Sequence, residues 1–376
     1  SRLNYPLIDG KVVGCPSHLL EPQRLQQIQY SESFDNAYWG KSGLLTPTSG
    51  FTSPKGDLSA FKLVEDTATT THQIQRSFSF LNQKYSLSAF LKADERNWIK
   101  VNLYDGSSSV YAYFDLTNGV VGQELGASGK IEDYGNGWYK CSMSTALNVS
   151  SGNGNISFRL AEFDGGTGYT GNGTSGFYIF GAQLEQGSFP TSYIPNYGTS
   201  AGITRVAETA NGAGDASTFN DSEGVLYFEG SALDDDGTDR KITLSDNSLN
   251  NRITIGFSRF SEKINGEIHS GGNIQTAGFG ANGVTQTNNN KFALAWGGGE
   301  GKFYVNGILA SLYTNITSPI GMNVLNFSLS SGFEKMFSNT KDLRVYDTKL
   351  NDSDLEKITS WVSFSDMANG QLYTIE

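Results

Sequence analysis

The residues best suited to bind a ligand lie between positions 98 and 113. Trp98, Tyr104, Tyr111 and Tyr113 fall in neighbouring strand-like stretches, and Asn102 lies between the first two. Flat aromatic rings cover the C–H faces of pyranose sugars, while an asparagine side chain reaches sugar hydroxyls. The pattern therefore indicates a carbohydrate-binding surface. The competing interpretation is that half of these residues fill the hydrophobic core.

Two further polar residues are candidate companions of this surface. Arg96 lies two residues before Trp98, and His72 lies earlier in the same predicted domain. Three of the other tryptophans are expected to be buried: Trp39 and Trp138 as core or edge residues, and Trp296 at the end of an alternating strand.

A group of acidic residues between positions 234 and 239 is a candidate calcium site. Asp234, Asp235 and Asp236 are consecutive, with Asp239 close behind, and calcium prefers several carboxylate and carbonyl oxygens. The spacing does not match a twelve-residue EF-hand loop, and no bidentate glutamate follows. The alternative, which the spacing favours, is a solvated acidic turn. We expect no required cofactor, with calcium as the one candidate.

The sequence does not indicate an enzyme. A retaining glycosidase needs two carboxyl groups about 5–5.5 Å apart, and no predicted strand carries two suitably spaced acidic residues on one face. His18, His72 and His269 are scattered and suggest no catalytic triad. A glycoside hydrolase or polysaccharide lyase assembled only in three dimensions stays open as the alternative.

Composition sets the fold class and excludes several partners. The chain has 376 residues, 45 of them glycine, with 12% aromatic and only 17% charged residues, which predicts an all-β protein of two domains. A net charge of -11 without a basic cluster argues against nucleic acid. The sequence contains no run of about 18 apolar residues, so it does not predict membrane insertion. Cys15 and Cys141 have no metal-like spacing.

Alternating stretches must position the aromatic residues. Residues 85–91, 99–103 and 156–160 alternate apolar and polar side chains, and Asn-Gly and Pro-x-Gly turns separate such stretches. About eight strands fit between Tyr30 and Gln183, which favours a jelly roll. A second set of strands starts near Glu223. We expect one short C-terminal helix, from Asp352 to about Val362, capped by Asn351.

The predicted organisation has four parts. Residues 1–29 form an extended N-terminal arm that contains three prolines. Residues 30–198 form the first β-sandwich and residues 199–221, rich in small residues, a linker. Residues 222–376 form the second β-sandwich.

Three stretches resemble known proteins. Residues 19–24 and 30–39 (LLEPQR and YSESFDNAYW) resemble an opening found in bacteriophage tail-fibre and related virion proteins. Residues 181–195 (GAQLEQGSFPTSYIP), followed by Thr204 and Arg205, resemble the end of their carbohydrate-binding-module-like jelly roll. Residues 224–229, 303–307 and 342–347 are similar to laminin-G or concanavalin-A-like lectin domains. Residues 25–27 (LQQ) depart from the usual Thr-Asn-Leu-like run.

The resemblance implies a function but carries over no catalytic residues. It implies a virion structural protein, a tail or head fibre, that acts outside the cell as a receptor-binding adhesin. The expected partners are a host cell-surface polysaccharide and other virion subunits, in a homotrimer. The alternatives are a purely structural virion component that mediates subunit contacts and a capsule polysaccharide depolymerase.

Overall fold

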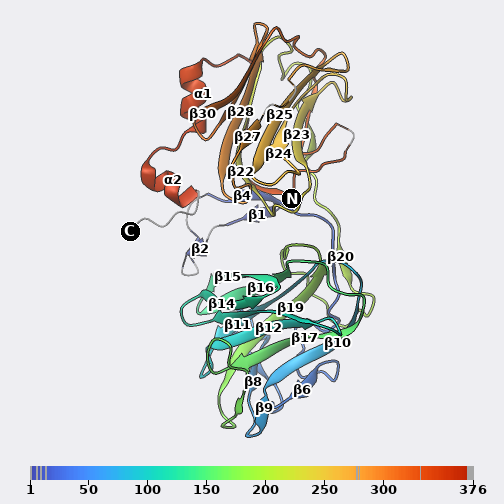
Figure 1. Cartoon of the computed structure of the whole chain (residues 1–376), viewed down its shortest axis with the longest axis vertical. Helices are drawn as coiled ribbons and strands as arrows, with labels where there is room; N and C mark the ends of the chain where they lie inside the picture. The colour runs from blue at the N-terminus through green and yellow to red at the C-terminus, as the bar shows by residue number, and fades with distance from the viewer. Residues whose placement is uncertain are drawn as a thin grey trace. The chain divides into compact units, whose positions relative to one another are not determined.

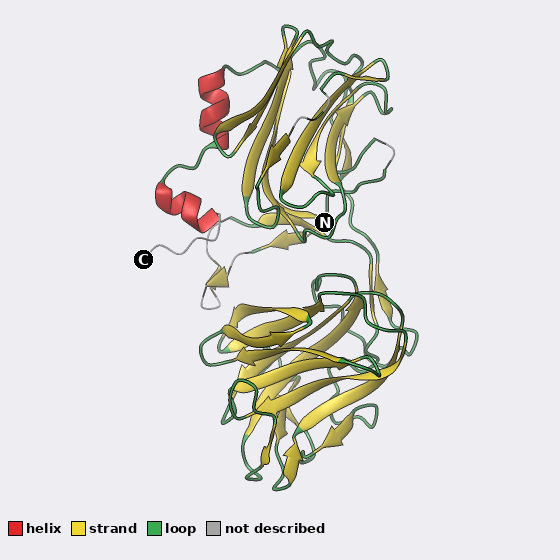
Figure 2. Ribbon diagram, in the orientation of Figure 1, coloured by secondary structure: helices red, strands yellow, loops and turns green. Residues whose placement is uncertain are grey.

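The computed structural model describes residues 2–5, 7–8, 11–12, 15–276, 278, 280–330 and 332–370. The chain divides into two compact units. The N-terminal sandwich comprises Pro6–Val13 and Gln23–Val206, and the C-terminal sandwich comprises Ser1–Tyr5, Gly14–Pro22 and Ala207–Glu376. Both are built from antiparallel β-sheets (Figures 1 and 2), so the all-β prediction of two sandwiches is confirmed.

The described residues of the N-terminal sandwich form two six-stranded sheets. The first has the order β14 (Val120–Leu125), β13 (Ser109–Asp115), β12 (Trp98–Tyr104), β17 (Gly152–Ala161), β10 (Gln73–Phe80) and β6 (Gly40–Ser42). The second has the order β15 (Ala127–Gly135), β16 (Trp138–Thr145), β11 (Tyr85–Ala93), β19 (Gly176–Gln186), β8 (Ala60–Val64) and β7 (Thr48–Phe51). Three short pairs accompany them: β2 (Leu7–Ile8) with β3 (Lys11–Val12), β5 (Arg24–Gln26) with β20 (Ile203–Arg205), and β9 (Thr69–Thr71) with β18 (Gly168–Thr170).

Period-two alternation builds the core between these two sheets. Ile99, Val101 and Leu103 of β12 point inward and are fully buried, as are Phe158 of β17 and Leu87 of β11. Side chains one position away along a strand must point to the opposite face. Trp98, Lys100, Asn102 and Tyr104 of β12 therefore point away from this core, which decides where the candidate ligand surface lies.

The segment after β19 folds back onto the N-terminal sandwich. The buried Gln183 accepts a hydrogen bond from the Ile194 amide at 2.6 Å, and Glu185 accepts one from the Thr191 amide at 2.9 Å. Tyr193 donates its hydroxyl proton to Glu32 at 3.0 Å. The side chains of Gln183 and Glu185 thus accept hydrogen bonds from backbone amides of residues 190–195. The two prolines of this stretch have no N–H group with which to join a β-ladder.

The C-terminal sandwich pairs two larger sheets. The first has the order β1 (Arg2–Asn4), β4 (Ser17–Leu20), β32 (Ser338–Tyr346), β22 (Gly224–Ala232), β28 (Asn290–Gly297), β29 (Glu300–Val305) and β30 (Ile308–Thr314). The second has the order β21 (Asn211–Ala213), β31 (Val324–Asn326), β23 (Arg240–Ser245), β24 (Arg252–Phe257), β25 (Lys263–Ser270) and β26 (Asn273–Ile274), with β27 (Gly280–Asn282) also on β25. The buried core between them includes Trp296, Phe228 and Phe257.

Two predicted segments are divided differently by the structure. The arm predicted for residues 1–29 supplies β1 and β4 to the C-terminal sandwich, where Leu19 pairs with Asn339. The linker predicted for residues 199–221 supplies β20 to one unit and β21 to the other. Sequence alone does not show these pairings, because each joins residues far apart along the chain.

Two helices lie near the C-terminus, where one was predicted (Figure 2). The first, α1 (Asp352–Thr359), starts where expected, with Asn351 accepting a hydrogen bond from the Asp354 amide at 3.0 Å. It ends three residues before the predicted end, at the Ser360 C-cap, and α2 (Phe364–Gly370) follows. Within the described residues, no helix is long and apolar enough to cross a membrane.

Replacing Asn351 with alanine should lower the free energy of unfolding by about 1 kcal/mol, since the cap satisfies an amide that α1 itself cannot pair. Urea unfolding of the variant and wild type would measure this. Asn351→Asp, which keeps an acceptor at the helix start, is the matched control and should lose much less. Equal losses in both variants would contradict a capping role.

Candidate functional site

Strand pairing lines up the outward side chains of β13, β12, β17 and β10 in rows across the first sheet. One row runs Tyr113, Lys100, Arg159 and Gln73. The next row runs Tyr111, Asn102, Ser157 and Gln75, and a third contains Tyr104, Asn155 and Ser77. We call these rows, together with Trp98 at the start of β12, the polar-aromatic face.

All five predicted sugar-binding residues lie on this face. Trp98, Tyr104 and Tyr111 are partly exposed, Tyr113 is buried, and Asn102 is fully buried. None of them belongs to the core cluster between the two sheets, whose members on β12 and β13 are the alternate residues. Two of the five are thus buried, though outside that cluster, and sugar binding by the five stays a prediction. Trp39, Trp138 and Trp296 are buried, as predicted.

Two cations occupy the middle of the face and were not singled out from the sequence. Lys100 lies directly opposite Arg159, and its ammonium is 3.6 Å from the centroid of Tyr111 and 5.2 Å from that of Tyr113. Arg159 donates from Nε to the Ser157 hydroxyl at 2.9 Å. Burial first, and then the nearby Arg159 charge, lower the pKa of Lys100 to about 8. Burial also lowers the pKa of Arg159.

Buried polar atoms without partners gather around the two cations. Asn102 has no exposed surface, yet neither its Oδ1 nor its Nδ2 makes a hydrogen bond. Asn155 Oδ1 and Gln73 Oε1 are likewise buried and unpaired. An unpaired buried polar group costs about 1–3 kcal/mol, so such groups are uncommon in a folded domain. Four such atoms, on three side chains of one face, indicate a surface organised for a partner that supplies hydrogen bonds.

A loop and a glycine border the face near Trp98. A Cβ on Gly122 would lie 2.6 Å from the Trp98 ring and 2.7 Å from Asp164, so only glycine allows the indole to lie against β14. Asp164 accepts hydrogen bonds from the Gln123 amide. Tyr113 hydrogen-bonds the Thr167 side chain, and its burial raises its pKa. The loop that carries residues 164 and 167 therefore fixes one end of the face.

The two predicted companions belong to a different cluster. Arg96 donates two hydrogen bonds to the fully buried Glu65, at 2.8 and 2.7 Å, and its guanidinium lies 4.8 Å from the Tyr169 ring. His72 is fully buried against Tyr169 and the Gly43 carbonyl. Both residues hold the framework of the N-terminal sandwich and have no place on the polar-aromatic face.

The aspartates proposed for calcium bind protein groups. Asp236 pairs with Arg240 at 2.7 Å, and Asp235 accepts from the Ser261 hydroxyl at 2.5 Å. Asp239 accepts from the Arg259 amide. Across the described part of the chain, no three His, Cys, Asp or Glu residues are grouped to hold a metal ion. Calcium binding through Asp234, Asp235 and Asp236 stays a prediction.

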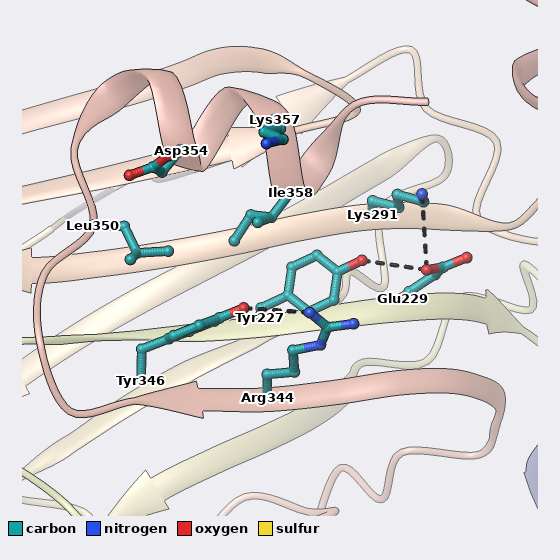
Figure 3. A pocket seen from close by; sticks show the side chains of 9 residues that line it. All are labelled: Tyr227, Glu229, Lys291, Arg344, Tyr346, Leu350, Asp354, Lys357 and Ile358. Atoms are coloured by element: carbon teal, nitrogen blue, oxygen red, sulfur yellow. Dashed lines mark hydrogen bonds and ion pairs between the residues drawn. The ribbon is translucent and has the colours of Figure 1, made fainter. Parts of the chain in front are cut away.

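A hollow in the C-terminal sandwich lies between α1 and the outer face of β22, β28 and β32 (Figure 3). Its volume is about 410 Å³. Its lining includes Tyr227, Glu229, Lys291, Arg344, Tyr346, Leu350, Asp354, Lys357 and Ile358. Glu229 accepts from Tyr227 and pairs with Lys291 at 3.9 Å, while Arg344 pairs with Asp342 at 2.5 Å. Glu229 and Arg344 therefore already have partners, which makes the hollow a weaker candidate than the polar-aromatic face.

The lowered pKa of Lys100 predicts a pH-dependent stability difference. Between pH 8 and 10.5 the unfolded chain binds a proton at this lysine that the folded chain has lost, so stability rises with pH across this window. Lys100→Met should therefore raise the free energy of unfolding by about 2 kcal/mol at pH 7, and this gain should shrink towards pH 10. Urea unfolding at both pH values measures it. The control Lys130→Met, at an exposed lysine, should show no gain; a gain for Lys100→Met that is independent of pH would contradict the assignment.

Comparisons with known proteins show only distant structural similarity. No family model matches the chain, and no curated protein is similar enough to count as a match. Among solved structures, the CBM40 domain of the Ruminococcus gnavus IT-sialidase has 13% identity over 40% of this chain and 94% of that chain, with a TM-score of 0.32. The leech intramolecular trans-sialidase has 16% identity over 41% and 27% of the chains, with a TM-score of 0.31. The mouse laminin alpha1 chain domains LG4-5 have 10% identity over 80% and 91%, with a TM-score of 0.27. Scores this low carry no argument, so the assignment of two β-sandwiches rests on the strand pairing described above.

Proposed function

We propose that this protein binds glycans without catalysis and that the polar-aromatic face of the N-terminal sandwich is its binding site. The observation that carries the proposal is Asn102, a fully buried amide without hydrogen bonds, in a row that begins with Tyr111. A sugar offers what this arrangement lacks, because its hydroxyls both donate and accept hydrogen bonds while its C–H groups pack on aromatic rings.

Binding requires a small rearrangement of the face. Asn102 is fully covered, so a sugar hydroxyl reaches its amide only after neighbouring long side chains rotate. Lys100 and Tyr104 flank it on β12, and Tyr111 faces it from β13. Rotation of such side chains is common when interfaces form, and the rigid sheet beneath them keeps the backbone in place.

A glycan array with the intact chain tests the proposal. Wild type should be retained on a subset of polysaccharides, and Tyr111→Ala should weaken retention about two- to twelvefold, because a stacked ring contributes about 0.5–1.5 kcal/mol beyond the area it buries. Tyr197→Ala removes an exposed tyrosine of the same unit outside the face and should bind as wild type does. No retention of any glycan by a folded wild-type chain would sink the proposal and favour a purely structural role. Reducing ends released from a retained polysaccharide would instead show a depolymerase.

The biological setting proposed here rests on the sequence resemblance alone. We propose a bacteriophage tail- or head-fibre adhesin that acts on the virion, outside the host cell, where it binds a surface polysaccharide and other virion subunits. A homotrimer would present three weak sites to a repeating polymer and so gain avidity. Native mass spectrometry should then give a mass about three times that of the 40.7 kDa chain; a monomer at micromolar concentration would contradict the trimer.

A further inference from the structure

We infer that the polar-aromatic face selects an acidic glycan, whose carboxylate is bound between Lys100 and Arg159. The inference rests on the proposed function and adds the class of sugar. It names a hexuronic acid or a sialic acid, which share a carboxylate attached to a pyranose ring.

The first argument is the pairing of two positive charges. Lys100 and Arg159 are directly opposed on adjacent strands, an arrangement that is unfavourable unless an anion lies between them. Within the described residues, neither forms an ion pair with a carboxylate: Lys100 lies against the rings of Tyr111 and Tyr113, and Arg159 contacts Ser157 and Tyr113. The chain as a whole has a net charge of -11, so this local pair is not part of a generally basic surface.

Two acidic residues at the end of the face, Asp164 and Asp115, bind backbone amides of turns and loops. Asp164, beside Tyr113, accepts two hydrogen bonds from the Gln123 amide. Asp115, at the end of β13, accepts from the amides of Thr117 and Asn118. These contacts hold both carboxylates in loops at the end of the face, and among the described residues neither pairs with Lys100 or Arg159.

The second argument is the match between the donors and a carboxylate. A guanidinium presents a planar fork of N–H groups that fits the two oxygens of a carboxylate, and Nε of Arg159 is fixed by Ser157. The ammonium of Lys100 adds a point charge. A partly buried site strengthens these interactions relative to water.

The third argument is the spacing of the rows. Lys100 and Asn102 are two residues apart on β12, about 6.6 Å along the strand. One acidic sugar can therefore place its carboxylate at the row of Lys100 and Arg159 and its ring and hydroxyls at the row of Asn102 and Tyr111. The cations and the unpaired amides then serve the same ligand.

Binding of the intact chain to matched acidic and neutral polymers tests the inference. The probes are polygalacturonate and α2,8-linked polysialic acid, each beside its carboxyl-reduced form, with dextran sulfate as a polyanion without carboxylates. We expect at least tenfold tighter binding to one native acid than to its reduced form, and the acid that binds identifies the source of the carboxylate. Binding that is equal for the native and reduced forms of both polymers would overturn the inference but leave glycan binding intact. Binding to none of these polymers or to any array glycan would overturn both proposals. If dextran sulfate bound as tightly as the favoured acid, the inference would also be overturned.

Charge variants connect the binding to the two cations. Lys100→Met and Arg159→Gln should each weaken binding to the favoured acid at least tenfold, whereas Lys130→Met should not change it. Thermal unfolding of each variant checks that it folds, and Lys100→Arg, which keeps the charge, should bind more tightly than Lys100→Met. Unchanged binding in both charge-removing variants would overturn the inference.

A pH profile separates a direct charge contact from a structural role. The titratable or charged groups that face Lys100 are Arg159 on β17 and Tyr111 and Tyr113 on β13. Wild-type affinity for the favoured acid should fall at least threefold from pH 7 to pH 9.5 as Lys100 loses its proton, while the affinity of Lys100→Arg should stay level. A level wild-type profile would count against the Lys100 contact and so overturn the inference.

Discussion

Asn102→Leu is expected to stabilise the protein and to abolish glycan binding. Leucine has the same number and branching of side-chain heavy atoms as asparagine but no polar atoms, so the substitution removes two buried groups that have no hydrogen-bond partner. Each such group costs about 1–3 kcal/mol, and the free energy of unfolding should rise by about 2–4 kcal/mol. A residue that lowers stability and is retained is expected where function requires it.

Urea unfolding and glycan retention, measured on the same preparation, check both halves of this prediction. Asn148→Leu is the matched control, since Asn148 is exposed and its amide donates to Asn82. It should not gain stability and should keep binding. An Asn102→Leu variant that loses stability would show that the Asn102 amide is hydrogen-bonded. A variant that binds glycan as wild type does would show that the binding site lies elsewhere.

Glu65→Ala is expected to lower the free energy of unfolding by about 3–5 kcal/mol. Glu65 is fully buried and accepts two hydrogen bonds from Arg96, one from the Tyr169 hydroxyl at 2.6 Å and one from the Asn172 amide at 3.0 Å. Removing Glu65 leaves the Arg96 guanidinium partly buried without its counter-ion. An unpaired buried charge lowers the free energy of unfolding more than replacement of both partners does. A loss below about 1 kcal/mol in urea unfolding would contradict this description.

The same cluster predicts the behaviour of the protein in acid. Burial alone would raise the pKa of Glu65, but hydrogen bonds from Arg96, Tyr169 and Asn172 outweigh it and hold the pKa below 4.5. A carboxyl with a lowered folded pKa stabilises the fold above its unfolded pKa and loses this effect as pH falls through the folded value. Glu65→Gln should therefore lose less stability relative to wild type at pH 3 than at pH 7.

Local patterns in the sequence were enough to place the predicted ligand residues on one face. Alternation through Ile99, Val101 and Leu103 assigns these three to the core and Asn102 to the other side, whatever the partner strands are. The Asn351 cap likewise marked the start of α1, because capping depends on neighbours in sequence. Both predictions needed only contacts between residues close along the chain.

The decisive part of the site could not be predicted in this way. In the sequence, Lys100 alternates with apolar residues, as any solvent-exposed lysine on the outer face of a sheet does. Only the strand pairing places Arg159 opposite it. The same limit explains the N-terminal segment, whose Leu19 pairs with Asn339 near the other end of the chain. Arg96 and His72 were misplaced for a related reason, since their partner Tyr169 lies far along the chain on β18.

The side-chain amide of Asn102 offers the most direct test of glycan binding at the polar-aromatic face. Its two N–H signals can be assigned in an amide NMR spectrum of the intact chain by their loss in Asn102→Leu. On titration with polygalacturonate or polysialic acid fragments, these signals should shift and their exchange with water should slow as the amide gains hydrogen bonds. Saturating binding that leaves the Asn102 signals unchanged, while amide signals of the C-terminal sandwich shift, would contradict the assignment of the site.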